Sequence, residues 1–520
     1  MTTVTVQEVP ERYNACDILD HNMEAGQGDK VAIHCGADTL TYADLAARTH
    51  AFGAALHEAG VRREERVLLI LDDTPAWPIA FLGAMRVGAV PVPVSFLDNP
   101  QNFAHYLRDS YARVVVVECG VSDKLAGVLA DVPARPLVWS ANGDAEGAIP
   151  LDELLAEHAG AEVTTVDTHR DDMAFWLYSS GSTGKPKGVV HLHHDIPYTC
   201  QTYARHILEI DEADITLSTT KLYHAYGMGA NLSFPYSAGA SSVLLPGRAN
   251  PEGALSVAAE FRPTLFFSVP TLYNAMLNLP DAREYDLSSV RRCASAAEPL
   301  SPTVLRRWRE TFGLDILDGI GSTEMLHIYC SNRPDHIVPG TSGEPVPGYE
   351  IKLLDEDGQE VPDGEIGNLH VRGDSAHAFY WHQHEKTKAT LKGEWLFTGD
   401  RYRHTAEGGY VYEGRADDMI KVGGLWVSPI EVEHTLAEHP LVIEAAAVGV
   451  RVEETTRVKA YVTCREREQS DEELAAELQG WCKERLRRYE YPHFFAFVDE
   501  LPKTLTGKIQ RYKLRELDQS

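Results

Sequence analysis

The chain has 520 residues, of which 44% are apolar and 24% are charged. This length exceeds what one compact core usually supports, so we expect two or more domains. Acidic residues outnumber basic residues 77 to 48, and the formal net charge of -29 argues against nucleic acid and anionic membranes as partners. Eight scattered cysteines without a CxxC pair, and an N-terminus without an apolar signal core, favour a cytoplasmic protein.

Short apolar runs alternate with helix-like segments over the first two thirds of the chain. Runs that are apolar on both faces predict buried strands, and they lie at 67–71, 114–117, 174–178, 265–267 and 314–317. Helices are expected between them, at 77–87, 271–279 and 302–311. This alternation predicts an α/β fold, with a large N-terminal domain of stacked α/β sheets.

The pattern of apolar runs and turn residues changes twice after this region. From about residue 343, short strands between Asp/Gly turns predict a small barrel-like β unit. A second change falls near residues 415–418, and beyond it Ser428 and Pro429 open a helix as cap and first-turn residue. Two strands, a helix and a further apolar run follow, enough for a small α+β domain. We place the domain boundary between 1–416 and 417–520.

The segment 178–188 reads YSSGSTGKPKG and directly follows a predicted strand. Its glycines let successive N–H groups face an anion, and its hydroxyls and lysines supply further donors. It differs from the P-loop of other nucleotide-binding proteins, because Pro186 follows Lys185 where Ser or Thr is required. We predict a phosphate-binding loop, and its candidate residues are Ser180, Gly181, Ser182, Thr183, Gly184, Lys185 and Lys187.

This loop resembles the ATP loop of the adenylate-forming superfamily, which contains acyl-CoA synthetases, nonribosomal adenylation domains and beetle luciferases. Further stretches resemble the superfamily's motifs in the same order, from about residue 40 to residue 511. They are DGIGSTE at 318–324, FTGD at 397–400, YEGRADD at 412–418 and LPKTLTGKI at 501–509. The resemblance implies that the segment 1–416 binds ATP and an acid and forms an adenylate, and that 417–520 is a mobile domain carrying a catalytic lysine.

The resemblance also assigns roles around the nucleotide. Thr183 and Glu324 are expected to be catalytic, with Glu324 holding Mg²⁺, a cation that prefers oxygen ligands and bridging phosphates. Asp400 is expected to accept hydrogen bonds from the ribose, with Arg415 nearby. The remaining nucleotide-binding candidates are Ala297, Glu298, Pro299, Asp318, Gly319, Ile320, Gly321, Thr323 and Tyr412.

On the mobile domain, Lys508 resembles the catalytic lysine of adenylation, whose ammonium stabilises charge where the carboxylate meets the α-phosphate. Asp417 matches the hinge position of the superfamily. Gly423 and Gly424 are expected to line a channel for the pantetheine arm of coenzyme A. The expected cofactors are therefore ATP, Mg²⁺ and coenzyme A.

The residues expected to contact the acid lie in KLYHAYG at 221–227 and directly after the Thr-Glu motif. Adenylation domains for amino acids usually place an Asp at the first of these stretches, and none is present here. The candidates are His224, Ala225, Tyr226, Gly227, His327 and Ile328. This pattern most resembles the benzoate–CoA ligase branch and implies an aryl carboxylic acid, either benzoate or a substituted benzoate.

Several residues depart from the branch: His224 stands where Phe is expected, and Ser268 and Ala297 stand where glycine is expected. The identity of the ring substituent therefore stays open. Two alternatives also stay open. One is a stand-alone aryl-AMP ligase that loads a separate acyl carrier protein, and the other is a catalytically silent protein of the same fold.

Overall fold

The computed structural model describes residues 6–130, 132, 135–179, 185–416, 418–422, 425–452, 455–465, 469–503 and 509–517. The chain divides into two compact units. Unit 1 comprises Met1–Glu350 and Arg372–Leu396, and unit 2 comprises Ile351–Val371 and Phe397–Ser520. The domain boundary predicted after residue 416 stays a prediction, because the division into two units reflects packing and does not locate a hinge.

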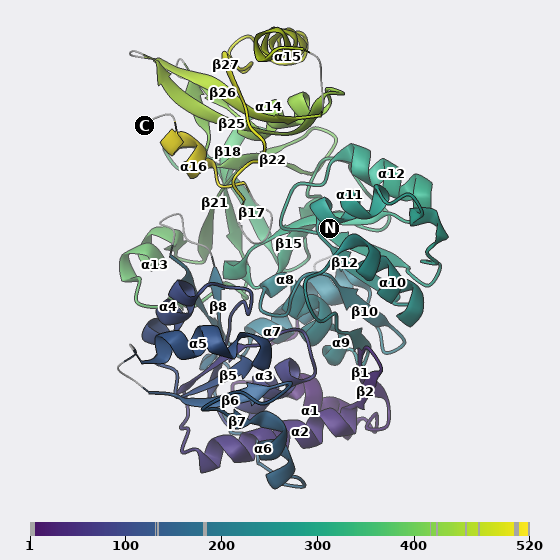
Figure 1. Ribbon diagram of the computed structural model, residues 1–520, viewed down its shortest axis with the longest axis vertical. Coiled ribbons are helices and arrows are strands. Elements are labelled where there is room, and N and C mark those ends of the chain that lie inside the picture. The colour runs from purple at the N-terminus through teal and green to yellow at the C-terminus, as the bar shows by residue number, and fades with distance from the viewer. Residues whose placement is uncertain are drawn as a thin grey trace. The chain divides into compact units, whose positions relative to one another are not determined.

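The largest sheet of unit 1 has nine strands, and its centre is parallel. The strand order is β16 (Glu344–Pro345), β15 (Ile328–Ser331), β14 (Ile316–Gly321), β13 (Arg292–Ser295), β12 (Leu265–Ser268), β10 (Ile215–Ser218), β11 (Ser241–Val243), β1 (Val31–Cys35) and β2 (Asp38–Thr41). Helices α10 (Pro251–Phe261), α11 (Pro270–Leu277) and α12 (Pro302–Phe312) lie along it (Figure 1). Phe266, Tyr273 and Trp308 are fully buried between these layers.

A second sheet of unit 1 is parallel throughout, in the order β4 (Val90–Pro93), β3 (Arg66–Ile70), β5 (Val114–Glu118), β6 (Leu137–Ala141) and β7 (Ile149–Pro150). Its core includes Leu68, Val115 and Phe103, the last from α4 (Pro100–Ser110). The predicted strand and helix at 67–71 and 77–87 are confirmed as β3 and α3 (Ala76–Arg86).

A smaller antiparallel sheet has the strand order β19 (Phe379–Tyr380), β9 (Lys187–Leu192) and β8 (Met173–Ser179). Strands β8 and β9 flank the predicted phosphate loop.

The predicted strand at 314–317 is wrong in its bounds, because β14 runs from Ile316 to Gly321. Pairing with β15 extends β14 through the glycine-containing motif.

A five-stranded sheet consists of β17 (Glu350–Leu354), β18 (Ile366–Arg372), β21 (Trp395–His404), β20 (Leu391–Lys392) and β22 (Tyr410–Arg415). Most of its residues belong to unit 2, whereas β20 belongs to unit 1. The remainder of unit 2 contains β25 (Val442–Val452), β26 (Thr455–Cys464) and β27 (Phe494–Phe497), with α14 (Pro429–Ala437) and α15 (Asp471–Arg485). Ser428 caps α14 as predicted, since its hydroxyl accepts the N–H of Glu431. The described residues contain no helix that is long and apolar enough to cross a membrane.

Candidate active site

The carboxyl ends of three neighbouring parallel strands carry most of the predicted site in unit 1. Ser268 ends β12 and Ser295 ends β13, and these two residues are register partners. Ser295 in turn pairs with Asp318 of β14. Open α/β sheets bind ligands at this edge, so the structure brings the predicted segments 297–299 and 318–324 to a position suited to a nucleotide.

The Thr-Glu motif itself forms a short turn after β14. Residues Thr323–Met325 are a 3₁₀ helix, and the Ser322 hydroxyl accepts the N–H of Met325 at 3.2 Å. Two side chains of the small sheet hold this turn, since His191 Nε2 lies 2.7 Å from the carbonyl of Thr323 and Lys187 contacts Glu324.

Glu324 is the best-defined carboxylate of the site. Lys187 Nζ and the Tyr380 hydroxyl both donate to its Oε1, at 2.7 Å and 2.9 Å. Burial by itself would raise the pKa of this carboxyl, but the charge and hydrogen bond of Lys187 outweigh it and lower the pKa to about 2. Glu324 is therefore ionised at any physiological pH. Lys187 also lies 4.0 Å from the centre of the Tyr380 ring.

An ionised carboxylate fits Mg²⁺, which binds through one or two protein carboxylates and takes its other ligands from phosphates and water. The described residues contain no cluster of three or more His, Cys, Asp or Glu that could hold a metal ion by themselves. The histidine-rich segment HLHHD at 191–195 makes contacts within the protein. His191 Nδ1 lies 2.6 Å from Asp195, and His193 accepts the N–H of Ala15.

The segments expected to contact the acid meet around His327. Its Nε2 lies 3.2 Å from the backbone carbonyl of Tyr226, and its ring packs against Phe234, Tyr203 and Tyr226 at centroid distances of 4.4, 5.2 and 5.5 Å. Ala225 and Ile328 are also buried. The Tyr226 hydroxyl donates to the carbonyl of Ser268 at 3.4 Å. The structure thus brings the 224–227 and 327–328 segments together.

Glycines make these approaches possible. A Cβ on Gly229 would overlap the His327 ring, and one on Gly321 would overlap the His327 carbonyl. Ala297 has a φ of 76°, a left-handed backbone that favours glycine. This conformation explains why a glycine is expected at that position.

The predicted ribose residues lie together in unit 2. Asp400 and Arg415 are register partners on β21 and β22, and Arg415 Nη1 donates to Asp400 Oδ1 at 2.9 Å. Tyr412 lies on the same strand as Arg415, and burial raises the pKa of its hydroxyl far above the usual value.

Several predicted residues lie outside the described part of the chain, so their roles stay predictions. They are Ser180, Gly181, Ser182, Thr183, Gly184, Asp417, Gly423, Gly424 and Lys508. Lys185 is described and is exposed.

Sequence reasoning missed three supports of the site. Tyr380 and His377 both adjoin Glu324, with the His377 N–H donating to the Glu324 carbonyl at 2.7 Å. Lys221 makes a buried ion pair with Asp72 at 2.8 Å, directly before the acid-contacting segment. The sequence feature that could have indicated Lys221 is its position as a single lysine at the start of an otherwise uncharged stretch.

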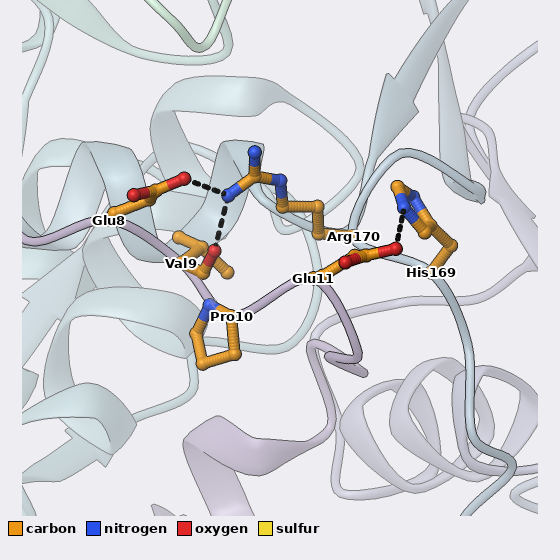
Figure 2. A pocket seen from close by; sticks show the side chains of 6 residues that line it. All are labelled: Glu8, Val9, Pro10, Glu11, His169 and Arg170. Atoms are coloured by element: carbon orange, nitrogen blue, oxygen red, sulfur yellow. Dashed lines mark hydrogen bonds and ion pairs between the residues drawn. The ribbon is translucent and has the colours of Figure 1, made fainter.

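A separate surface pocket lies elsewhere on unit 1, between the N-terminal segment and the residues before β8 (Figure 2). Arg170 Nη1 donates to the Glu8 carboxylate at 2.9 Å and to the Val9 carbonyl at 2.6 Å. His169 Nε2 lies 3.6 Å from Glu11. None of the predicted site residues lines this pocket.

The fold and the site define the class of this protein: the chain belongs to the AMP-binding enzyme family. The model of that family matches residues 19–381, and the model of the AMP-binding enzyme C-terminal domain matches residues 431–508. The predicted boundary at residue 416 falls between the two matches.

Three relatives indicate the branch. The chain is 44% identical to the benzoate–CoA ligase of Thauera aromatica over 98% of this chain and 97% of the relative. An anthranilate CoA ligase, AuaEII, solved in complex with anthranoyl-AMP, superposes with a TM-score of 0.93 at 40% identity and covers 99% of each chain. A benzoate CoA ligase from Burkholderia xenovorans LB400 superposes with a TM-score of 0.89 at 42% identity, covering 97% of this chain and 100% of that one.

Proposed function

We propose that this protein is an ATP-dependent aryl-acid–CoA ligase that acts on benzoate or a substituted benzoate. The observation that carries the proposal is the ion pair of Glu324 with Lys187 in the turn after β14, three residues before His327 and the aromatic rings packed on it. Full-length similarity to the benzoate–CoA ligase of Thauera aromatica supports the same activity.

In the first half-reaction, a carboxylate oxygen of the acid attacks the α-phosphorus of ATP, and the bond to pyrophosphate breaks. Both reactants are anions, so cationic and N–H groups must neutralise charge in the transition state. We assign Glu324 to Mg²⁺, which supplies charge neutralisation at the phosphates. Lys187 keeps the Glu324 carboxylate ionised and in place.

In the second half-reaction, the thiol sulfur of coenzyme A attacks the carbonyl carbon of the adenylate. A C–S thioester bond forms and the bond between the carbonyl carbon and the bridging oxygen breaks. AMP leaves with that oxygen, which came from the carboxylate, and the thiol proton passes to solvent. We assign Lys508 to the first half-reaction and Gly423 and Gly424 to the thiol channel of the second, on their place in the family's motifs.

The proposal also includes the thiol that accepts the acyl group and the location of the protein. Coenzyme A is the proposed acceptor, and an acyl carrier protein is the alternative. We propose a cytoplasmic location, which agrees with eight cysteines that are all free thiols.

The test measures ATP–pyrophosphate exchange with a panel of benzoates, aliphatic acids and amino acids. We expect exchange with aryl acids and little with the others, followed by thioester formation when coenzyme A is added. Thioester formation on a phosphopantetheinylated carrier but not on coenzyme A would favour the carrier-loading alternative. Absence of exchange with every acid would support the silent protein.

A further inference from the structure

Two consecutive aspartates of the five-stranded parallel sheet bind the start of the segment that is expected to contact the acid. Asp72 and Asp73 follow β3 of that sheet, and Lys221 and Leu222 follow β10 of the nine-stranded sheet. Lys221 Nζ donates to Asp72 Oδ1 at 2.8 Å, and the N–H of Leu222 donates to Asp73 Oδ1 at 3.0 Å. The Lys221 and Asp72 side chains are 8% and 11% exposed, and Asp73 is buried. These hydrogen bonds join the two sheets at residues 221 and 222.

The same groups hold the loop after the neighbouring strand. Asp72 Oδ2 accepts the N–H of Gly247 at 2.5 Å, and Lys221 Nζ also donates to the carbonyl of Leu245 at 2.5 Å. Gly247 and Leu245 follow β11, which pairs with β10. A buried ion pair keeps its geometry, because separating the partners leaves uncompensated charges. We call Asp72, Asp73 and Lys221 the carboxylate–lysine cluster.

The backbone of Lys221 in turn determines where the acid-contacting segment lies. The N–H of His224 donates to the Lys221 carbonyl at 3.0 Å. Gly227 lies so close to the carbonyls of Thr220 and Lys221 that a Cβ would overlap both oxygens. His224 and Gly227 are the first and last residues of the stretch expected to contact the acid. Both ends of that stretch therefore rest on a residue that the cluster holds in place.

We propose that Asp72, Asp73 and Lys221 are positioning residues that set the affinity for the acid by fixing the backbone of residues 224–227. This inference rests on the proposed function, and it assigns the cluster a role beyond joining the two sheets. A binding segment that is fixed before the acid arrives loses less conformational freedom on binding, so the acid binds more tightly. Loosening the cluster should therefore raise KM for the acid and leave KM for ATP nearly unchanged.

Two variants of Asp73 test this role. Asp73→Ala removes the acceptor of the Leu222 N–H, whereas Asp73→Asn keeps an oxygen that can accept it. ATP–pyrophosphate exchange gives KM for each substrate, with the aryl acid that the unaltered protein activates best. In Asp73→Ala we expect KM for the acid to rise by about 5-fold to 50-fold, the effect of leaving a buried N–H unpaired. In Asp73→Asn it should stay within about threefold of the unaltered protein, and in both variants KM for ATP should change by less than about twofold.

Asp214→Ala is the matched control. Asp214 is buried at the opposite end of β10, where its Oδ2 accepts the N–H of Asp211 at 2.9 Å and pairs with Arg291 at 2.6 Å. The variant thus removes a carboxylate with the same kinds of partner, but it does not touch the acid-contacting segment. We expect thermal unfolding to show a lower Tm for Asp214→Ala, with KM for the acid unchanged.

Asp73→Ala can also fail to fold, and thermal unfolding detects this. In that case the double variant Asp72→Asn, Lys221→Met decides, because it removes both charges of the pair together and leaves neither uncompensated. KM for the acid should rise in this variant as well, with KM for ATP unchanged.

The outcomes separate this inference from the proposed function. A KM for the acid in Asp73→Ala equal to that of Asp214→Ala would overturn the inference alone, and so would equal rises in KM for the acid and for ATP. In either case the cluster would serve only to hold the sheets together. Failure of the unaltered protein to activate any aryl acid would overturn the proposed function and this inference with it.

Discussion

Lys187 Nζ lies 2.7 Å from Glu324 Oε1, and the two side chains are 9% and 16% exposed. The pair joins β9 of the small antiparallel sheet to the turn after β14 of the large sheet. A buried pair of this kind depends on both partners, since removing one leaves a charge uncompensated.

We expect Glu324→Gln to lower the adenylation rate by about 100-fold or more, because it removes a charged group that stabilises the transition state. Pyrophosphate exchange measures this rate, and Glu310→Gln, at an exposed position on α12, is the control. A variant with the rate of the control would show that Glu324 takes no part in the reaction.

Lys187→Met should lower the free energy of unfolding by roughly 3–5 kcal/mol, measured in urea.

A pair of glycine variants tests the support of His327. Gly229→Ala would push a Cβ into the His327 ring, whereas Gly227→Ala would push one into the backbone carbonyls of Thr220 and Lys221. A side chain can move and a backbone carbonyl cannot do so cheaply. We expect Gly229→Ala to raise KM for the aryl acid with little change in KM for ATP.

The Gly227→Ala variant should instead destabilise the fold, by roughly 1–3 kcal/mol. Thermal unfolding and the kinetics of both variants distinguish these effects. Identical losses in the two variants would mean that His327 is not displaced in the way its contact with Gly229 indicates.

Lys508→Ala separates the two half-reactions. Its ammonium is required where the carboxylate meets the α-phosphate, so adenylation should nearly cease while thioester formation from supplied acyl-adenylate survives. Both rates are measured on the same preparation. Equal loss in the two half-reactions would contradict a role confined to adenylation.

His193 gives the stability of unit 1 a pH dependence. Burial lowers the pKa of this side chain from 6.5 to about 4, with Asp172, Arg63 and His194 exerting smaller effects. Between these two values the unfolded chain binds more protons at this site than the folded chain does. The stabilising contribution is therefore complete above pH 6.5 and is lost as the pH falls towards 4.

The slope from this one site reaches at most about 1.4 kcal/mol per pH unit. His193→Asn keeps an acceptor for the N–H of Ala15 but does not titrate. Urea unfolding from pH 4 to pH 7 should show a shallower slope in the variant. Parallel profiles would assign the pH dependence to other groups.

The sequence by itself determined the elements and the order of the motifs. Both depend on residues close together in the chain: β3 and α3 follow from local apolar periodicity, and the start of α14 follows from Ser428 and Pro429. The end of β14 was missed because pairing with β15, rather than local preference, extends it.

Only the tertiary structure decided which distant side chains meet. Lys187 and Glu324 are 137 residues apart, and Tyr226 and His327 are 101 residues apart. Such contacts depend on sheet register and on glycines that let backbones approach, and neither leaves a local trace in composition. Nδ1 of His327, which is buried and has no hydrogen-bond partner among the described residues, is a result of the same kind, since an atom is left without a partner only when every packed neighbour is in place.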